Sequence, residues 1–129
     1  MADMPLVLIV DDDADFRDIC KMKLLAEGIR VETAENGEEG IMKAKALKPT
    51  LMLLDMKMPG ASGADTILKL REDPAMKEMK VIFLSAFGDP RAEFQEFDKR
   101  VAAEMGAVDY VKKTDDLSIL VDKVKILLE

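Results

Sequence analysis

Histidine is absent from this sequence, and cysteine occurs only once, at Cys20. Without histidine the chain offers no Ser-His or Cys-His catalytic pair, no histidine zinc ligand and no histidine that donates a phosphoryl group. A single cysteine excludes an internal disulfide, which is typical of proteins in a reducing compartment. We predict that Cys20 fills a core position on the first helix, because free cysteine packs as a small hydrophobe.

Long apolar runs and an excess of positive charge are also missing. No stretch approaches the roughly 18 consecutive apolar residues of a membrane span, and the N-terminal residues do not resemble a signal peptide. The net charge of −7 argues against a basic nucleic-acid-binding surface. These absences predict a cytoplasmic protein that has neither a membrane nor a nucleic acid as a partner.

The remaining composition is that of a globular domain. With 49% apolar and 35% charged residues, a chain of 129 residues is long enough to bury one core without staples. There is no linker, internal repeat or low-complexity tract. We therefore predict one domain over residues 1–129.

Short apolar runs alternate with segments of helical period. The predicted strands are Leu6–Val10, Arg30–Ala34, Thr50–Leu54, Val81–Leu84 and Val108–Lys112. The predicted helices are 14–27, 38–47, 64–71, a long amphipathic helix between Pro90 and Gly106, and a last helix from Leu117 to Leu128. This alternation predicts a (βα)5, flavodoxin-like α/β fold, in which a doubly wound sheet of five parallel strands has helices on both faces.

Polar residues stand where the predicted strands end. Asp11 and Asp12 follow the first strand, Asp55 the third, Ser85 the fourth, and Lys113 the fifth. In open parallel sheets, ligands bind at the carboxyl ends of the strands, so we expect these side chains to meet at one edge. Carboxylates facing a lysine suit a hard divalent cation together with a phosphoryl group.

Four segments together resemble the receiver domain of two-component response regulators. They are Val10–Asp13, Asp55–Gly63, Ser85–Ala86 and Tyr110–Lys113. Each segment alone is weak evidence for the family. All four occur in this order, and each lies at the end of a predicted strand, which together makes a strong signal. The resemblance covers essentially the whole chain. It implies a phosphorylation-dependent signalling switch that catalyses its own phosphorylation and dephosphorylation and is not a turnover enzyme.

The resemblance also implies the metal and acceptor residues. Asp55 would accept the phosphoryl group. Mg²⁺, or Mn²⁺ in its place, would be bound directly by Asp12 and Asp55, through water by Asp11, and by the backbone carbonyl of Lys57. This division suits magnesium, which keeps several waters and takes one or two carboxylates plus phosphate.

Further roles follow from the same resemblance. Lys113 would pair with a phosphoryl oxygen, and the Ser85 hydroxyl and Ala86 N–H would bind another. Met56, beside the acceptor, is assigned together with Ala86 and Lys57 to cofactor binding. Tyr110 would follow the hydroxyl inward as a switch. The face formed by the fourth helix, fifth strand and fifth helix would thereby be remodelled.

The implied partners are proteins. A sensor histidine kinase or a histidine phosphotransfer protein would supply the phosphoryl group. An output protein or a second copy of the chain would bind the remodelled face. Because the sequence ends with the last predicted helix, we expect no effector domain in this chain, and the sequence also permits a receiver excised from a longer regulator or hybrid kinase.

Two features depart from the family's pattern. Thr114 stands where the family usually has proline after Lys113, so we expect a trans peptide there. Lys112 is then a possible substitute for Lys113. The segment between Ser85 and Lys113 is several residues longer than usual, which predicts an enlarged fourth helix region and an altered partner surface.

Other interpretations of these residues stay open at this stage. Asp11–Asp13 would also fit a solvated turn that caps a helix, and we assign Asp13 itself to capping or solvent. Ser85 would also fit an ordinary strand-end hydroxyl, and Tyr110 a half-buried strand aromatic.

Other functions are also open. A phosphohydrolase with an aspartyl-phosphate intermediate would need an acid two residues after the nucleophile, where this chain has Lys57. A flavodoxin-like cofactor module would need a Gly/Ser/Thr-rich loop after the first strand, where this chain has three aspartates. A degenerate receiver that binds partners without phosphorylation is a further alternative.

Overall fold

A parallel sheet of five strands forms the centre of the molecule. The computed structural model describes residues 5–58, 60–85, 103 and 106–129. The strands are β1 (Leu6–Val10), β2 (Arg30–Ala34), β3 (Leu51–Asp55), β4 (Lys80–Ser85) and β5 (Asp109–Lys112). They lie in the order β2-β1-β3-β4-β5, and each neighbouring pair is parallel. The predicted sheet is confirmed.

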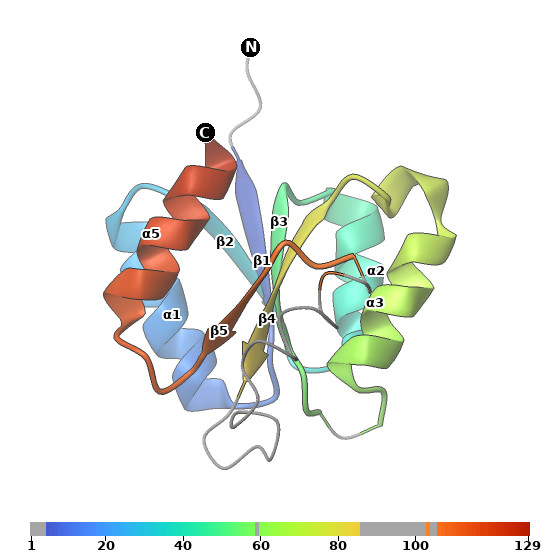
Figure 1. Cartoon of the computed structure of the whole chain (residues 1–129), viewed down its shortest axis with the longest axis horizontal. Coiled ribbons are helices and arrows are strands. Elements are labelled where there is room, and N and C mark those ends of the chain that lie inside the picture. Colours follow the sequence, from blue (N-terminus) through green and yellow to red (C-terminus); the bar gives the residue numbers. More distant parts are fainter. Residues whose placement is uncertain (1–4, 59, 86–102, 104–105) are drawn as a thin grey trace.

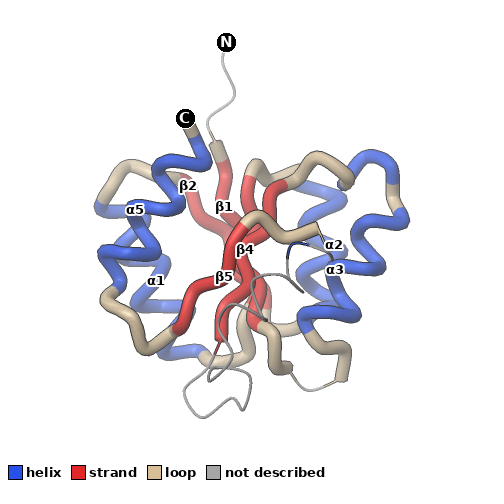
Figure 2. The backbone as a smooth tube through the Cα atoms, viewed as in Figure 1, coloured by secondary structure: helices blue, strands red, loops and turns tan. Residues whose placement is uncertain are grey.

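Helices cover both faces of this sheet (Figures 1 and 2). The helices α1 (Ala14–Ala26) and α5 (Leu117–Leu128) lie on one face, and α2 (Gly37–Leu47) and α3 (Gly63–Glu72) lie on the other. A short 3-10 helix, Pro74–Met76, links α3 to β4. The doubly wound, flavodoxin-like architecture is confirmed. The predicted helix before Gly106, with its enlargement, falls outside the described residues.

The buried strands explain why the sequence shows continuous apolar runs. Every residue of β1 and β3 is buried, because helices cover both sides of a parallel sheet. Side chains of successive residues then point into two separate cores. Leu8 and Leu54 pack beneath α2 and α3, whereas Ile9 and Leu53 pack beneath α1 and α5. Cys20 is buried in the second of these cores, as predicted.

The ends of β3 and β4 lie one residue later than predicted, and this difference affects two candidate site residues. The strand β3 includes Asp55, and β4 includes Ser85, whereas we expected both residues to follow their strands. Asp55 pairs with Leu84, and the Met56 N–H donates a 3.0 Å hydrogen bond to the Leu84 carbonyl. The ladder therefore fixes the backbone of Asp55 and Ser85. Their side chains start from a rigid platform.

The predicted bounds of β1 and β2 are confirmed, and several other predicted ends are wrong by one residue, which is the usual uncertainty of element boundaries. In the structure α1 ends at Ala26, α2 begins at Gly37, α3 runs from Gly63 to Glu72 and β5 begins at Asp109. Gly28, just beyond α1, has the left-handed conformation predicted for it, with a φ of +79°.

The start of α1 is set by Asp13. Its Oδ1 accepts hydrogen bonds from the N–H groups of Asp15 at 3.0 Å and Phe16 at 3.2 Å. This confirms the assignment of Asp13 to helix capping. With this cap, the first turn of α1 begins immediately after Asp11 and Asp12 in the chain.

Among the described residues, no helix is long and apolar enough to cross a membrane.

Candidate functional site

Three aspartates meet where the strand order reverses. From β1 the chain passes to β2 on one side, and β3 lies on the other side, so the carboxyl ends of β1 and β3 flank a topological switch point. Asp11 and Asp12 follow β1, and Asp55 ends β3. Each offers a carboxylate oxygen within 4.8 Å of those of the other two. The predicted convergence of these acids is confirmed.

Their environments differ. Asp11 is 0% exposed and Asp55 is 2% exposed, whereas Asp12 faces solvent. The Oδ1 atom of Asp11 accepts the Asp13 N–H at 2.9 Å, and Oδ1 of Asp55 accepts the Lys57 N–H at 3.2 Å. A solvated turn therefore does not describe Asp11. Its carboxylate is buried and held in place by the backbone.

Lys113 reaches into the same cluster from the end of β5. Its Nζ lies 2.6 Å from Asp11 Oδ2 and 3.3 Å from Asp55 Oδ2, and its side chain is only 11% exposed. The peptide before Thr114 is trans, as expected, and the ammonium still reaches the acids. Lys112 lies within β5, in register with Ser85. Lys113, and not Lys112, is therefore the lysine of this site.

Burial and charge act together on the ionisation of the cluster. Burial, followed by the charge of Asp11, raises the pKa of Asp55 to about 7, although Lys113 and the Lys57 N–H act in the opposite direction. Burial alone would lower the pKa of Lys113, but Asp11 and Asp55 outweigh it, so the pKa is raised. Two buried carboxylates are thus held together by a single ammonium group.

The donor set fits a hard divalent cation. The three carboxylates supply oxygen ligands only, which suit Mg²⁺ or Mn²⁺ and do not suit softer metals. Their mutual repulsion is relieved by a cation between them. Asp11, Asp12 and Asp55 are therefore the residues that would hold the ion. Lys57, the further ligand implied by the resemblance, has an exposed side chain, and the role of its carbonyl stays a prediction.

Ser85 is the last residue of β4, the strand that pairs with β3, and Tyr110 lies within β5. Ser85 is fully buried, and its Oγ has no hydrogen-bond partner among the described residues. Tyr110 is 4% exposed and lies next to Phe83 in the sheet. Met56 is also buried. The predicted contribution of Ala86 falls outside the described residues.

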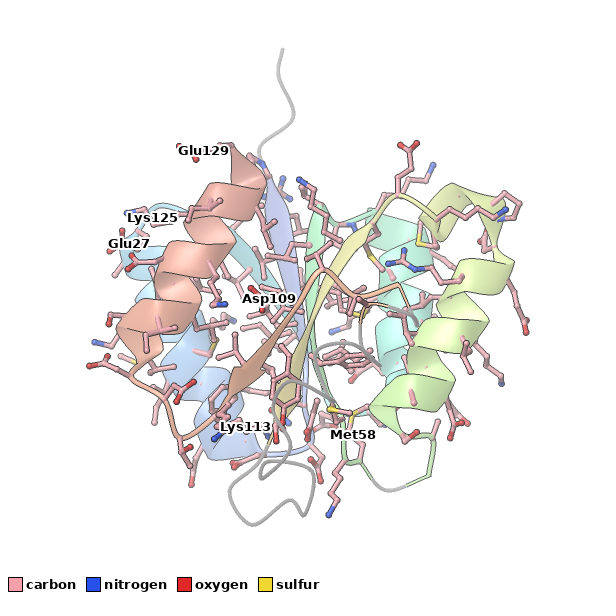
Figure 3. The ribbon with its side chains drawn as sticks, in the orientation of Figure 1. Glu27, Met58, Asp109, Lys113, Lys125 and Glu129 are labelled. Atoms are coloured by element: carbon pink, nitrogen blue, oxygen red, sulfur yellow. The ribbon has the colours of Figure 1, made fainter. Side chains whose placement is uncertain are left out.

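Two hollows open at this edge of the sheet. One, of about 380 Å³, is lined by Met56, Lys57, Met58 and Ser62. The other, of about 350 Å³, is lined by Asp12 together with residues of the loops before α2 and α3. Lys113 and Met58 lie at this end of the molecule, and Glu27, Lys125 and Glu129 lie at the opposite end (Figure 3). The acid cluster is thus flanked by space for a small donor group.

Sequence reasoning missed two residues of α1 that touch the site. The Phe16 ring centroid lies 5.0 Å from Lys113 Nζ, with the ammonium over the ring. Arg17 donates from Nη1 to the Asp11 carbonyl at 2.7 Å, and its Nη2 lies 3.5 Å from Glu35 Oε1. The one available signal was their position in the first turn after the cap at Asp13. The side of the helix on which Phe16 and Arg17 lie does not by itself predict these contacts.

Comparison with known proteins gives a consistent result. The family model described as the response regulator receiver domain matches residues 7–125. The chain is 33% identical over 97% of its length to the DNA-binding dual master transcriptional regulator RpaA of Synechocystis. It is 35% identical over 95% of its length to the transcriptional regulatory protein ResD of Bacillus subtilis. These matches cover 49% and 47% of the two regulators, so the chain spans about half of their length.

Solved structures agree with this match. A putative response regulator from Chloroflexus aurantiacus is 30% identical, with a TM-score of 0.84 and 98% of both chains covered. A response regulator receiver protein from Pseudomonas putida is 28% identical, with a TM-score of 0.84, covering 98% of this chain and 99% of that one.

Proposed function

Because the chain belongs to the response regulator receiver domain family, we propose that Asp55 accepts a phosphoryl group from a histidine of a sensor kinase or phosphotransfer protein. The family consists of signalling proteins and not of turnover enzymes. The observation that carries the proposal is the placement of Asp55 beside two further carboxylates and the Lys113 ammonium.

The transfer needs an ionised Asp55 in line with the donor bond. A carboxylate oxygen of Asp55 forms a bond to phosphorus while the bond from phosphorus to the donor nitrogen breaks, and the electron pair leaves with the donor. Lys113 then pairs with an oxygen of the transferred group. The hollow beside Met56 and Lys57 gives a donor room to approach.

Mg²⁺ or Mn²⁺ bound by Asp11, Asp12 and Asp55 would neutralise the negative charge of the phosphoryl group. The chain's own part is to orient those carboxylates. Asp11 and Asp55 are each fixed by a backbone N–H, and Asp12 lies at the solvent side where the ion and its waters enter.

Ser85 and Tyr110 are the proposed switch. The buried Ser85 hydroxyl turns to an oxygen of the phosphoryl group, with the Ala86 N–H beside it, and Tyr110 adjusts its packing. The new contacts favour one of two arrangements of the fold. Phosphorylation of Asp55 thereby changes the conformation of β5 and of the elements around it.

The proposed output surface includes β5 and α5. Lys123 of α5 pairs with Asp109 of β5 at 2.6 Å, which joins the two elements. Ile119 and Ile126 are exposed apolar residues on α5. We propose that an output protein or a second copy binds here. We also propose a cytoplasmic location, with which the single cysteine agrees. The charge of −7 argues against direct binding of nucleic acid.

Intact mass after incubation with acetyl phosphate and Mg²⁺ tests the central claim. We expect one added phosphoryl group on the wild type, and none on Asp55→Asn or without divalent cation. Asp122→Asn, on the exposed side of α5, is the matched control and should be phosphorylated like the wild type. If the wild type stays unmodified with several phosphodonors, the chain is a degenerate receiver and the proposal fails.

A further inference from the structure

Within the described part of the chain, Lys113 has three neighbours in the site, Asp11, Asp55 and Phe16, of which Phe16 carries no charge. Its Nζ contacts Asp11 and Asp55 and lies over the ring of Phe16, 5.0 Å from the centroid. An ammonium within about 6 Å of an aromatic ring face is attracted by the ring's quadrupole, more strongly when water is excluded. With 11% of its side chain exposed, Lys113 is in such an environment.

We propose that Phe16 is a positioning residue for Lys113, and that it holds the ammonium in the site whether or not a cation occupies the carboxylates. The contact itself is a feature of the folded chain. Its consequence for phosphoryl transfer rests on the proposed function.

In the part of the chain that the structure describes, few other contacts fix Lys113. It is the first residue beyond β5, which ends at Lys112, and it is followed by Thr114. Among the described residues, one backbone hydrogen bond ties it to the sheet, from its N–H to the Ser85 carbonyl at 2.7 Å. The four-carbon side chain has many rotamers of similar energy. The position of the ammonium therefore depends on what the ammonium itself contacts.

The two acids cannot be the whole explanation. Asp11 and Asp55 are also the carboxylates that would hold the divalent cation, so an ion bound there would compete with Lys113 for the same two carboxylates. The Phe16 ring is neutral and does not bind that ion. It continues to attract the ammonium when the acids are engaged, and so keeps Lys113 ready to pair with a phosphoryl oxygen.

The ring is itself well placed to act as a fixed support. The Phe16 N–H donates to the capping Asp13, which sets the first turn of α1. The side chain packs against the core between the sheet and α1 and α5. A ring held by the core and by a helix cap gives the mobile lysine a rigid surface.

A double-mutant cycle on folding stability tests the contact without metal or phosphodonor. Phe16→Leu keeps an apolar side chain but removes the ring, and it is combined with Lys113→Met. We expect the two changes to be coupled by about twofold to tenfold in the unfolding equilibrium constant. The matched cycle with Lys112→Met should show no coupling. Equal coupling at both lysines, or none at either, would overturn the contact.

A spectroscopic signature complements the cycle. In the wild type, ring currents of Phe16 should shift the NMR signals of the Lys113 Cε protons upfield, and Lys113→Met identifies those signals. We expect the shift to be lost in Phe16→Leu and kept in Phe16→Tyr, which retains the ring face. An unchanged Lys113 signal in Phe16→Leu contradicts the proposal.

The functional consequence is measured on phosphorylation by acetyl phosphate at saturating Mg²⁺. Phe16→Leu should slow it about threefold to tenfold, as expected for loss of one contact of this strength, and Phe16→Tyr should restore the rate. A wild-type rate in Phe16→Leu would overturn the positioning role. If the wild type itself is not phosphorylated, the proposed function fails, while the cycle and the NMR shift still decide the contact.

Discussion

At the scale of single residues, two buried hydroxyl groups form a matched pair. Thr66 Oγ1 donates a 2.8 Å hydrogen bond to the Ser62 carbonyl, whereas Ser85 Oγ has no partner among the described residues. Losing a satisfied hydrogen bond costs about 1 kcal/mol, and losing an unsatisfied hydroxyl is close to neutral. The Ser85 hydroxyl thus makes no hydrogen bond to the described residues that would stabilise the unphosphorylated fold.

We predict that Thr66→Val lowers the free energy of unfolding by about 1 kcal/mol and that Ser85→Ala changes it by less than about 0.5 kcal/mol. Urea denaturation of both variants without Mg²⁺ measures this. We also expect Ser85→Ala, but not Thr66→Val, to change the lifetime of phosphorylated Asp55. A large stability loss in Ser85→Ala would mean that the hydroxyl is structural.

Cys20 provides a second prediction at this scale. Burial, and secondarily the charge of Asp11, raise the pKa of its thiol to about 12. At pH 8 roughly one thiol in ten thousand is then ionised, and the thiolate is the reactive form. We predict that a thiol reagent such as DTNB modifies Cys20 only after denaturant is added. Rapid modification of the folded protein at pH 8 would contradict its placement in the core.

At the scale of elements, α1 serves the site through Arg17 as well as through Phe16. The Arg17 guanidinium holds the backbone carbonyl of Asp11, whose carboxylate is one of the three metal-site acids. A turn that is fixed at its carbonyl presents Asp11 and Asp12 in a defined direction. Arg17 thereby links the orientation of α1 to the geometry of the acids.

We predict that Arg17→Met weakens Mg²⁺ binding severalfold, measured by isothermal titration calorimetry, and that Arg17→Lys weakens it less. Glu35→Gln is the control. It removes the other partner of Arg17, but Glu35 is 73% exposed and 3.5 Å away, and such surface pairs contribute little. If Glu35→Gln weakens binding as much as Arg17→Met, the Arg17–Glu35 pair and not the carbonyl contact is responsible.

The elements also show what a sequence predicts and what it does not. Asp55 and Asp11 were placed together correctly because parallel strands joined by helices must end at the same edge. The contact between Phe16 and Lys113 was not predicted, since it depends on how α1 is rotated against the sheet. Gly63 was treated as a loop residue, yet it begins α3, where an added Cβ would lie 2.9 Å from Met56 Cα. Close packing of this kind leaves no periodic signal.

At the scale of the whole molecule, charge and metal binding act together on stability. A net charge of −7 makes the folded chain repel itself, so any added salt screens some of that repulsion. Specific binding of a divalent cation adds to this, because a ligand that binds only the folded state stabilises it by mass action. The two effects are separated by comparing Mg²⁺ with NaCl at equal ionic strength.

We predict that Mg²⁺ raises the Tm of the wild type above the NaCl reference. At tenfold excess over Kd the gain is about 1.4 kcal/mol, or roughly 4–8 °C for a domain of this size. Asp12→Asn should lose most of this gain. It should leave the metal-free Tm unchanged or slightly higher, because Asp12 is exposed and adds repulsion to the cluster. Differential scanning calorimetry measures both values. No gain above the NaCl reference in the wild type would show that screening accounts for the effect, and equal gains in the wild type and Asp12→Asn would show that Asp12 is not one of the metal ligands.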